Sequence, residues 1–341
     1  MTNRVNRRTA LGIGGAATAG AVLGLGSPAV AAPGGGAASD PQEEPLGTPR
    51  DKVALAYRVE KTRAGGNWYS YITVASSSGA AQVAAEENAD TVVEAYSVNK
   101  IAVATAVLDK VDRGLLTLDQ RVDVTAAIVV PGGDGIFSLD NAYPSSVTLG
   151  HVLAALLTVS DDTAVRLCGL VAPAAEINQI LVAKGFPNTQ VEPVANPNRF
   201  FLGTSTARET HNLLQALVGG TLLSPASTTF LLNLLRAPIA FNDGIRRTMS
   251  SDDRARIATK AGWFADARHE AGIIFSPAGA PVLTYVLFAD GQADPDNFGA
   301  THPAVQARAA LGPKFLAAVN GLTNPSAPSR RPRRYQPTNG G

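Results

Sequence analysis

The stretch SVNKIAVATAVLDKVDRG, residues 97–114, places a serine and a lysine three positions apart at the start of an apolar segment. From Ile101 onward, apolar residues recur every three or four positions until Gly114, a spacing typical of a helix with one buried face. Because residues i and i+3 share a helix face, we expect Lys100 about one turn from Ser97. The pair is either a nucleophile with its base or an ordinary helix start, with Ser97 as cap and Lys100 in solvent.

Two further motifs follow in order and favour the catalytic interpretation. Ser160-Asp161-Asp162 lies between two expected helices, 63 residues after Ser97, and Lys260-Ala261-Gly262 ends an expected strand 100 residues later. A serine hydroxyl is a poor nucleophile until a base removes its proton, and lysine can be that base when its pKa is lowered. One serine–lysine pair arises easily by chance, so the order and the gaps carry the weight.

Strand-like runs lie at both ends of the central region, and helical runs fill its middle. The strand-like runs are Val53–Val59, Trp68–Ala75, Arg256–Lys260, His269–Ser276 and Pro281–Ala289. After the helix that begins at Ser97, the helical runs are Val147–Leu157, Asp162–Leu170, Ala174–Lys184, Thr206–Leu217, Ser227–Leu235 and Ala304–Asn320. This order indicates an α+β fold, with one antiparallel sheet flanked by helices and an all-helical lobe.

The two ends of the chain differ from its body. Residues 1–31 hold paired arginines, a Gly/Ala-rich apolar stretch and a small-x-small cleavage site, so we expect a twin-arginine-type signal peptide. An uncleaved anchor is the alternative, but the apolar run is short of the roughly 20 strongly apolar residues that a span needs. We expect a flexible linker at 32–50, a catalytic domain at 51–323 and a disordered basic tail at 324–341.

Composition argues against several other functions. The formal net charge is +1, and the positive excess lies in the leader and the tail, so the mildly acidic body gives no reason to expect nucleic-acid binding. The four histidines fit no metal spacing, and no glycine-rich phosphate loop follows a strand, so we expect neither metal nor cofactor. Cys168, the single cysteine, lies among apolar residues and is expected to be a small core residue rather than a catalytic thiol.

The three motifs resemble the S-x-x-K, S-D-N and K-T-G set of the class A serine β-lactamases and the wider β-lactamase-like, penicillin-recognising hydrolases, over about residues 51–322. The resemblance implies a β-lactamase/transpeptidase-like fold. It implies that Ser97 is acylated, that Lys100 acts as its base and that Ser160 relays a proton to the leaving nitrogen. Lys260 is then expected to supply positive charge near the substrate carboxylate.

The resemblance also assigns roles to the end of the third motif. Gly262 is expected to allow close approach of the backbone, and the N–H of Trp263 to pair with that of Ser97 as an oxyanion hole. Ala261 stands where the family has a threonine or serine whose hydroxyl binds the substrate carboxylate. Arg246 or Arg268 is a candidate to compensate, although each is also typical of an ordinary surface charge.

Asp162 is the second departure, because the family has an amide at this position that donates to the substrate carbonyl. A carboxylate accepts hydrogen bonds and donates none unless it is protonated. It also stabilises the charged form of Lys100, which makes that lysine a weaker base. Asp162 is therefore expected to contact substrate, but in a different way from the family's asparagine.

Glu192-Pro193-Val194-Ala195-Asn196 resembles the E-P-x-L-N of the family's omega loop. The resemblance implies that Glu192 holds the deacylating water, with Asn196 as its partner. Gln190 stands where the family has an arginine, and residues 204–206 lack that arginine's aspartate partner, so the loop's usual salt bridge is missing. An ordinary loop acid is the alternative for Glu192.

We therefore expect an exported, monomeric serine hydrolase that opens β-lactam rings through an acyl-enzyme on Ser97. Its partner is a small-molecule substrate, and it meets a membrane only during export to the periplasm, the cell wall or the medium. One alternative is a sister hydrolase acting on another amide or ester with little β-lactam turnover. The other is a catalytically silent binding protein that keeps the fold.

Overall fold

The computed structural model describes residues 47–76, 80–139, 141–324, 327–333 and 338. The chain divides into two compact units, Met1–Glu44 and Pro45–Gly341, and every described residue belongs to the second. The expected signal peptide (1–31) and most of the expected linker (32–50) therefore lie outside the described residues. The end of that linker is helical, because the first helix begins at Pro49.

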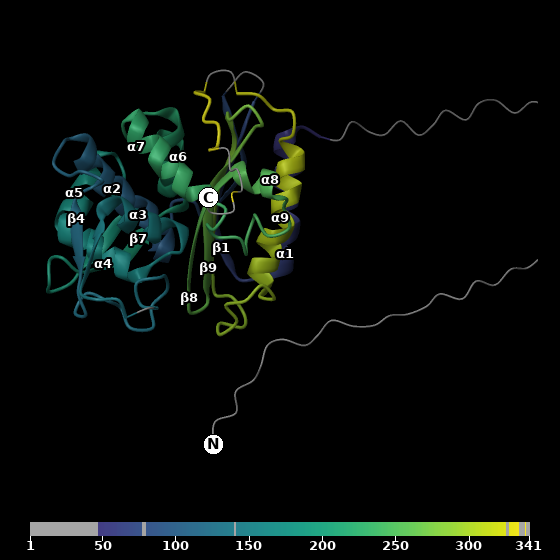
Figure 1. The fold of residues 1–341 in the computed structure, drawn as a ribbon. Coiled ribbons are helices and arrows are strands. Elements are labelled where there is room, and N and C mark those ends of the chain that lie inside the picture. The colour runs from purple at the N-terminus through teal and green to yellow at the C-terminus, as the bar shows by residue number, and fades with distance from the viewer. Residues whose placement is uncertain (1–46, 77–79, 140, 325–326, 334–337, 339–341) are drawn as a thin grey trace, which may run out of the picture. The chain divides into compact units, whose positions relative to one another are not determined.

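A five-stranded antiparallel sheet runs through the second unit in the order β2-β1-β10-β9-β8. Its strands β1, β8 and β9 are labelled in Figure 1. The strands are β1 (Asn67–Ala75), β2 (Ala81–Glu87), β8 (Ile257–Phe264), β9 (Ala267–Phe275) and β10 (Pro281–Asp290). β1 pairs with β10, so early and late parts of the chain meet inside the sheet. β8, which carries the third motif, is an edge strand, and its outer edge is available to the helical lobe.

Residues 49–64 form helix α1 (Pro49–Ala64), so the strand expected at Val53–Val59 was wrong. Thr48 and Asp51 cap the helix reciprocally, and Pro49 occupies its first turn, where no N–H is needed. One face of the helix is buried, with helical spacing, at Val53, Ala56, Tyr57 and Glu60. These residues pack with α9 (Pro303–Ala318) and the sheet, and that burial outweighs the strand propensity of valine and tyrosine.

The other face of the sheet packs against the helical lobe. Along β10, Val286 and Phe288 enter the core shared with the lobe, whereas Tyr285 and Leu287 enter the core beneath α1 and α9. The lobe's helices are α2 (Lys100–Asp112), α3 (Leu149–Thr158), α4 (Asp162–Val171), α5 (Ala174–Ala183), α6 (Ala207–Gly219) and α7 (Pro225–Leu235), and the short α8 (Ser251–Ala255) precedes β8. The α+β architecture expected from the sequence is confirmed.

The described helices include no single helix that could span a membrane, and one of them buries the single cysteine. None of them, taken singly, has the length and hydropathy to cross a bilayer, while α4 and α5, bent by 82°, meet the length and composition only as a pair. Cys168 on α4 is fully buried, and burial raises the pKa of its thiol to about 12. The expectation of a core cysteine is confirmed.

Two small sheets, which the sequence analysis did not predict, lie outside the main one. The first has the order β3-β7-β6 and consists of β3 (Val93–Glu94), β6 (Gln190–Pro193) and β7 (Phe200–Ser205). The second pairs β4 (Arg121–Val124) with β5 (Ser145–Thr148). β5 takes the place of the first two residues of the helix expected at Val147–Leu157. The Thr148 side chain accepts a hydrogen bond from His151 N and caps α3, which therefore begins at Leu149.

The described part of the expected disordered tail makes specific contacts. Arg330 N donates to Gly279 O (2.7 Å) in the turn between β9 and β10, and Ser329 Oγ donates to Ala278 O (2.5 Å). Arg236, at the end of α7, donates to Arg330 O (2.6 Å) and stacks over the ring of Phe275. Within residues 327–333, groups of the tail, of the β9–β10 turn and of α7 therefore satisfy one another, and the expectation of a disordered tail stays a prediction.

Candidate active site

Ser97 stands in a one-turn 3-10 helix, η1 (Tyr96–Asn99), that leads directly into α2. The side chain of Asn99 donates to the carbonyls of Leu202 (2.7 Å) and Thr204 (2.8 Å), which ties this turn to β7. Ser97 is half-buried and lines a pocket of about 340 Å³. Lys100 is fully buried, so the ordinary helix start with this lysine in solvent is excluded.

Gly262 on β8 lies directly against this turn. A Cβ atom at position 262 would stand 2.7 Å from Ser97 N and 2.7 Å from Val98 N, closer than real Cβ contacts. Only glycine therefore lets the edge strand approach the backbone of Ser97 this closely. Trp263 follows on the same strand and lines the pocket. The oxyanion hole expected from the N–H groups of Ser97 and Trp263 stays a prediction.

The ammonium group of Lys100 has all three of its donors engaged. Nζ donates to Ser160 O (2.5 Å), Ser160 Oγ (3.1 Å) and Asp162 Oδ1 (2.9 Å), and it makes no hydrogen bond to Ser97 within the described part of the chain. Burial lowers the pKa of Lys100, and the negative charge of Asp162 opposes that shift. Burial thus favours the neutral amine that can act as a base, whereas Asp162 holds the proton on it.

Ser160 receives hydrogen bonds from both motif lysines. Lys260 Nζ donates to Ser160 Oγ (2.9 Å) and to Ala261 O (2.6 Å), in addition to the Lys100 bond. A hydroxyl has two acceptor lone pairs and one proton, so with both lone pairs occupied the proton of Ser160 is free to be donated. Burial, followed by the positive charge of Lys100, holds the pKa of Lys260 well below its usual value. Ser160 also has a left-handed backbone (φ 55°), which turns the chain between α3 and α4.

Asp162 joins the lysine to a neighbouring loop. Its Oδ1 accepts from Lys100, while Oδ2 accepts from Asp134 N (3.0 Å) and its own N–H donates to Asp134 O (3.0 Å). The buried Asp161 strengthens this connection, because its Oδ2 accepts from Ile136 N (2.6 Å) and Phe137 N (3.0 Å). The second motif therefore fixes Lys100 and holds the loop around Asp134 at the pocket.

The remaining lining comes from the segment after α7 and from β8. Phe241 meets the ring of Trp263 edge to face, with 5.0 Å between ring centroids, and Ala261 is buried beside Lys260. Neither of the two arginines considered as replacements for the missing threonine lines the pocket. Arg246 donates to Ala237 O and Arg268 donates to four backbone carbonyls, so both are occupied elsewhere.

Glu192 and Asn196 are not among the residues that line the pocket, and neither side chain makes a hydrogen bond to Ser97, Lys100, Ser160 or Lys260 in the described part of the chain. Glu192 is on β6 opposite Phe201, whose side chain is 65% exposed, so the face of the hairpin that they share points to solvent. The Glu192 side chain makes no hydrogen bond with any described residue, and Asn196 Oδ1 accepts only from Asn198 N. The segment expected as an omega loop forms the β6–β7 hairpin instead.

Sequence reasoning missed two contributors to the pocket. Asp134 lies in the run PGGDG, whose glycines predict a turn but say nothing of what it lies beside. Phe241 and its neighbours follow α7 without any motif. Both segments reach the pocket through long-range contacts, so no local signal could have found them.

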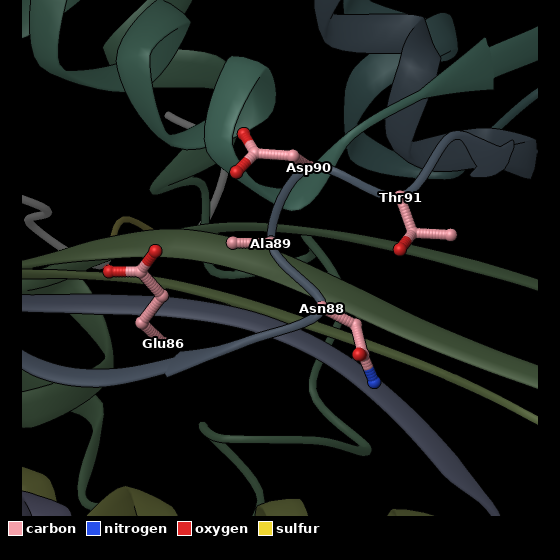
Figure 2. Close-up of a pocket in the computed structure, with 5 residues that line it drawn as sticks. All are labelled: Glu86, Asn88, Ala89, Asp90 and Thr91. Atoms are coloured by element: carbon pink, nitrogen blue, oxygen red, sulfur yellow. The ribbon is translucent and has the colours of Figure 1, made fainter.

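A second hollow, more open to solvent, is formed by Glu86, Asn88, Ala89, Asp90 and Thr91 (Figure 2). It holds no candidate nucleophile, and its two carboxylates are engaged by Arg208, which contacts Glu86 (2.5 Å) and Asp90 (2.6 Å). Over the described residues, no group of three or more His, Cys, Asp or Glu side chains is arranged to hold a metal ion. The pocket at Ser97 is the candidate active site.

Solved structures share this fold at low sequence identity. A β-lactamase from Sphaerobacter thermophilus DSM 20745 aligns with a TM-score of 0.64 and 23% identity, over 78% of this chain and 96% of that one. The ancestral GNCA class A β-lactamase, for the last common ancestor of Gram-negative bacteria, aligns with a TM-score of 0.63 and 21% identity, over 78% of this chain and 99% of that one. A PBP-A variant in an acyl-enzyme complex with penicillin G aligns with a TM-score of 0.60 and 22% identity, over 81% of this chain and 99% of that one.

Identities this low show the fold alone, which is that of the β-lactamases and of PBP-A. No curated protein sequence matches the chain. The family model described as "Beta-lactamase enzyme family" matches residues 55–318, most of the catalytic region delimited above. The chain therefore belongs to the β-lactamase enzyme family and resembles its class A members.

Proposed function

We propose that the protein is a serine hydrolase that forms an acyl-enzyme on Ser97. One observation carries the proposal: Ser97, Ser160 and Lys260, which come from distant parts of the sequence, line one pocket, and the buried Lys100 is hydrogen-bonded to Ser160 behind it. Two hydrogen bonds link both lysines to one serine hydroxyl beside the nucleophile. An ordinary core does not need two buried lysines, which are costly to bury without a function.

In the acylation step Lys100, in its neutral form, takes the proton of Ser97 as Oγ attacks the substrate carbonyl. Lys100 is engaged by three acceptors in this structure, so it must lose its proton and turn toward Ser97 first. Ser160 then passes its free proton to the leaving nitrogen and regains one from a lysine. The carbonyl oxygen receives the N–H groups of Ser97 and Trp263 in the proposed oxyanion hole.

The substrate is a small molecule with a reactive amide or ester. β-Lactams fit the family and the nucleophile, so we propose that they acylate Ser97 and that the ring opens. Slow release of the opened product is favoured, because Glu192, the expected base for deacylation, is not among the residues that line the pocket. This position supports the sister hydrolase with little β-lactam turnover over an efficient β-lactamase.

The place of action is also a proposal. The leader at residues 1–31 supports export through the twin-arginine route, followed by work in the periplasm, in the wall or outside the cell. A role in β-lactam resistance would require turnover as well as export. We propose a monomer that needs no cofactor, since the acylation chemistry above uses only side chains of one chain.

One experiment tests the function. The mature protein is incubated with a fluorescent penicillin and a chromogenic cephalosporin, and labelling and hydrolysis are followed together. Stable labelling with slow hydrolysis is expected, Ser97→Ala should abolish the label, and Ser251→Ala, an exposed serine on α8, should keep it. Fast hydrolysis would establish a β-lactamase. The silent binding protein would be the better account if neither penicillin nor a fluorophosphonate labelled Ser97.

A further inference from the structure

The cations of the pocket are already engaged by the protein itself. Lys100 donates its three hydrogen bonds to Ser160 and Asp162. Lys260 is buried and donates to Ser160 Oγ and Ala261 O. With alanine at position 261, the site also lacks the hydroxyl expected to bind a substrate carboxylate. An anionic group on the substrate therefore finds few donors here.

The accessible charge in the pocket is negative. The Asp134 side chain is exposed, lines the pocket, and has no hydrogen bond or ion pair with the residues that the structure describes. Its backbone is fixed by two hydrogen bonds to Asp162, so its place beside the pocket is set by the catalytic motif. The other carboxylate in the lining, Asp243, is paired with Arg247 at 2.8 Å.

The position of Asp134 indicates which part of a substrate it faces. Ser160 is the proposed donor to the leaving nitrogen, whereas position 162 is the one that the family uses to contact the acyl part of the substrate. Asp134 is bonded to Asp162, and the aromatic rings of Phe241 and Trp263 line the same pocket. Aromatic faces and a carboxylate together favour a cation that also carries an apolar group.

We propose that the acyl part of the substrate carries a protonated amine, and that Asp134 selects it. The inference rests on the proposed function, since it gives a substrate class to the Ser97 pocket. A cationic acyl donor meets the unpaired carboxylate, whereas an anionic one is repelled by it and finds both motif lysines already engaged. Asp134 is a specificity residue and takes no part in the bond-breaking steps.

Three amides that differ in charge at one carbon test the proposal. 2-Phenylglycinamide, 2-phenylacetamide and the monoamide of phenylmalonic acid are ammonium, neutral and carboxylate forms of one scaffold at about pH 6, below the usual pKa of an α-amine. Binding is followed by tryptophan fluorescence, because Trp263 lines the pocket and the only other tryptophan is buried. The ammonium form should bind roughly three- to fivefold more tightly than the neutral form, and the carboxylate form should bind least.

Two variants identify the residue responsible. Asp134→Asn should remove the preference, whereas Asp252→Asn, which makes the same change of net charge on exposed α8, should keep it. The wild-type preference should also shrink when ionic strength is raised from about 0.05 to 0.5 M. Equal binding of the three amides, a preference that survives Asp134→Asn, or no saturable binding of the ammonium form overturns the inference.

Failure of the inference can be told apart from failure of the function. A neutral fluorophosphonate reports the nucleophile whatever the charge preference of the pocket. Labelling of Ser97 together with charge-blind amide binding would overturn only the cationic substrate. Absence of labelling, with or without amide binding, would overturn the acyl-enzyme mechanism.

Discussion

The residues expected for acylation and those expected for deacylation are placed differently in this molecule. Ser97, Lys100, Ser160 and Lys260 come from three distant segments and meet at one pocket. Glu192 and Asn196 lie four positions apart in the sequence. Both are exposed, on or next to the β6 strand, and neither lines that pocket. Distance in the sequence therefore says little about which residues act together.

What holds each region explains the difference. Buried hydrogen bonds from both lysines fix the acylation residues, and Gly262 lets β8 close against Ser97. The β6–β7 hairpin is held by its own ladder and by pairing with β3, which settles which face of it is solvent-exposed. A motif match can survive in a segment whose backbone turns the matched side chain outward.

The largest effect is expected from removing the proposed nucleophile, Ser97, from the acylation residues. Ser97→Ala should lower acylation by penicillin at least roughly 1000-fold, because no other group attacks the carbonyl. Intact-mass measurement of the adduct, followed by peptide mapping, gives the readout. An adduct that persists in the variant, on Ser160 for example, would show that the nucleophile has been misassigned.

Gly262→Ala tests the closure of β8 on Ser97. The new methyl group would lie 2.7 Å from two backbone nitrogens, so the strand or the turn must shift, and acylation should fall roughly 10- to 100-fold through misplaced geometry. Gly219→Ala is the matched control, because nothing lies within 4 Å of the added atom. Comparable acylation rates for the two variants, with comparable melting temperatures, would contradict the role of Gly262.

Asp162→Asn should strengthen the acylation half. The amide restores a donor toward the substrate carbonyl and removes the charge that holds the proton on Lys100. The Asp162 side chain is 38% exposed, so the gain in the second-order rate of β-lactam acylation is expected at roughly five- to tenfold, the low end for a buried polar mismatch. A loss of activity on every acyl substrate would instead give the aspartate a positive role.

The pH dependence of acylation reports the same interaction. Burial lowers the pKa of Lys100, and Asp162 opposes this, so the neutral base accumulates as pH rises through that lowered pKa, and the rate should rise with it. In Asp162→Asn the opposing charge is gone, so the rising limb should move to lower pH. Stopped-flow acylation across the pH range checks both profiles, and an unmoved limb would remove Lys100 from the role of base.

Glu192→Gln gives the smallest expected effect and tests the residues expected for deacylation. Because the side chain is exposed and makes no hydrogen bond or ion pair with any described residue, acylation and release should each stay within roughly twofold of wild type. Time-resolved mass spectrometry of the acyl-enzyme separates the two steps. Accumulation of acyl-enzyme in the variant would mean that the β6–β7 hairpin rearranges and carries Glu192 into the pocket.

The parts of the fold that the sequence predicted are those with a strong local period. The helix from Lys100 to Asp112 and the strands β9 and β10 were found because apolar spacing marks each one. α1 was mistaken for a strand, since its valines and tyrosine suggested β structure and its capping residues lie outside the segment considered. The short strands β3 to β7 exist through pairing alone, which no local pattern records.

The same division holds for the candidate site. Motif order and gaps singled out Ser97, Ser160 and Lys260 together, and the structure places all three in the lining of one pocket. The environment of Asp134 depends on carboxylates 27 and 28 positions later that accept its loop's N–H groups. Nothing in the glycine-rich turn itself encodes that partnership, so the specificity role that we propose for Asp134 could be inferred only from the folded chain.

The strand order bears on how the protein is made. β1 lies between β2 and β10, so one edge of the β1–β2 hairpin stays unpaired until residues 281–290 have been synthesised and pair with β1. The pocket also needs β8, which leaves the ribosome about 160 residues after the nucleophile. A nascent chain that carries Ser97 but not yet β8 therefore has no assembled pocket, and the reactivity proposed for Ser97 must wait until β8 has been made and has paired with β9.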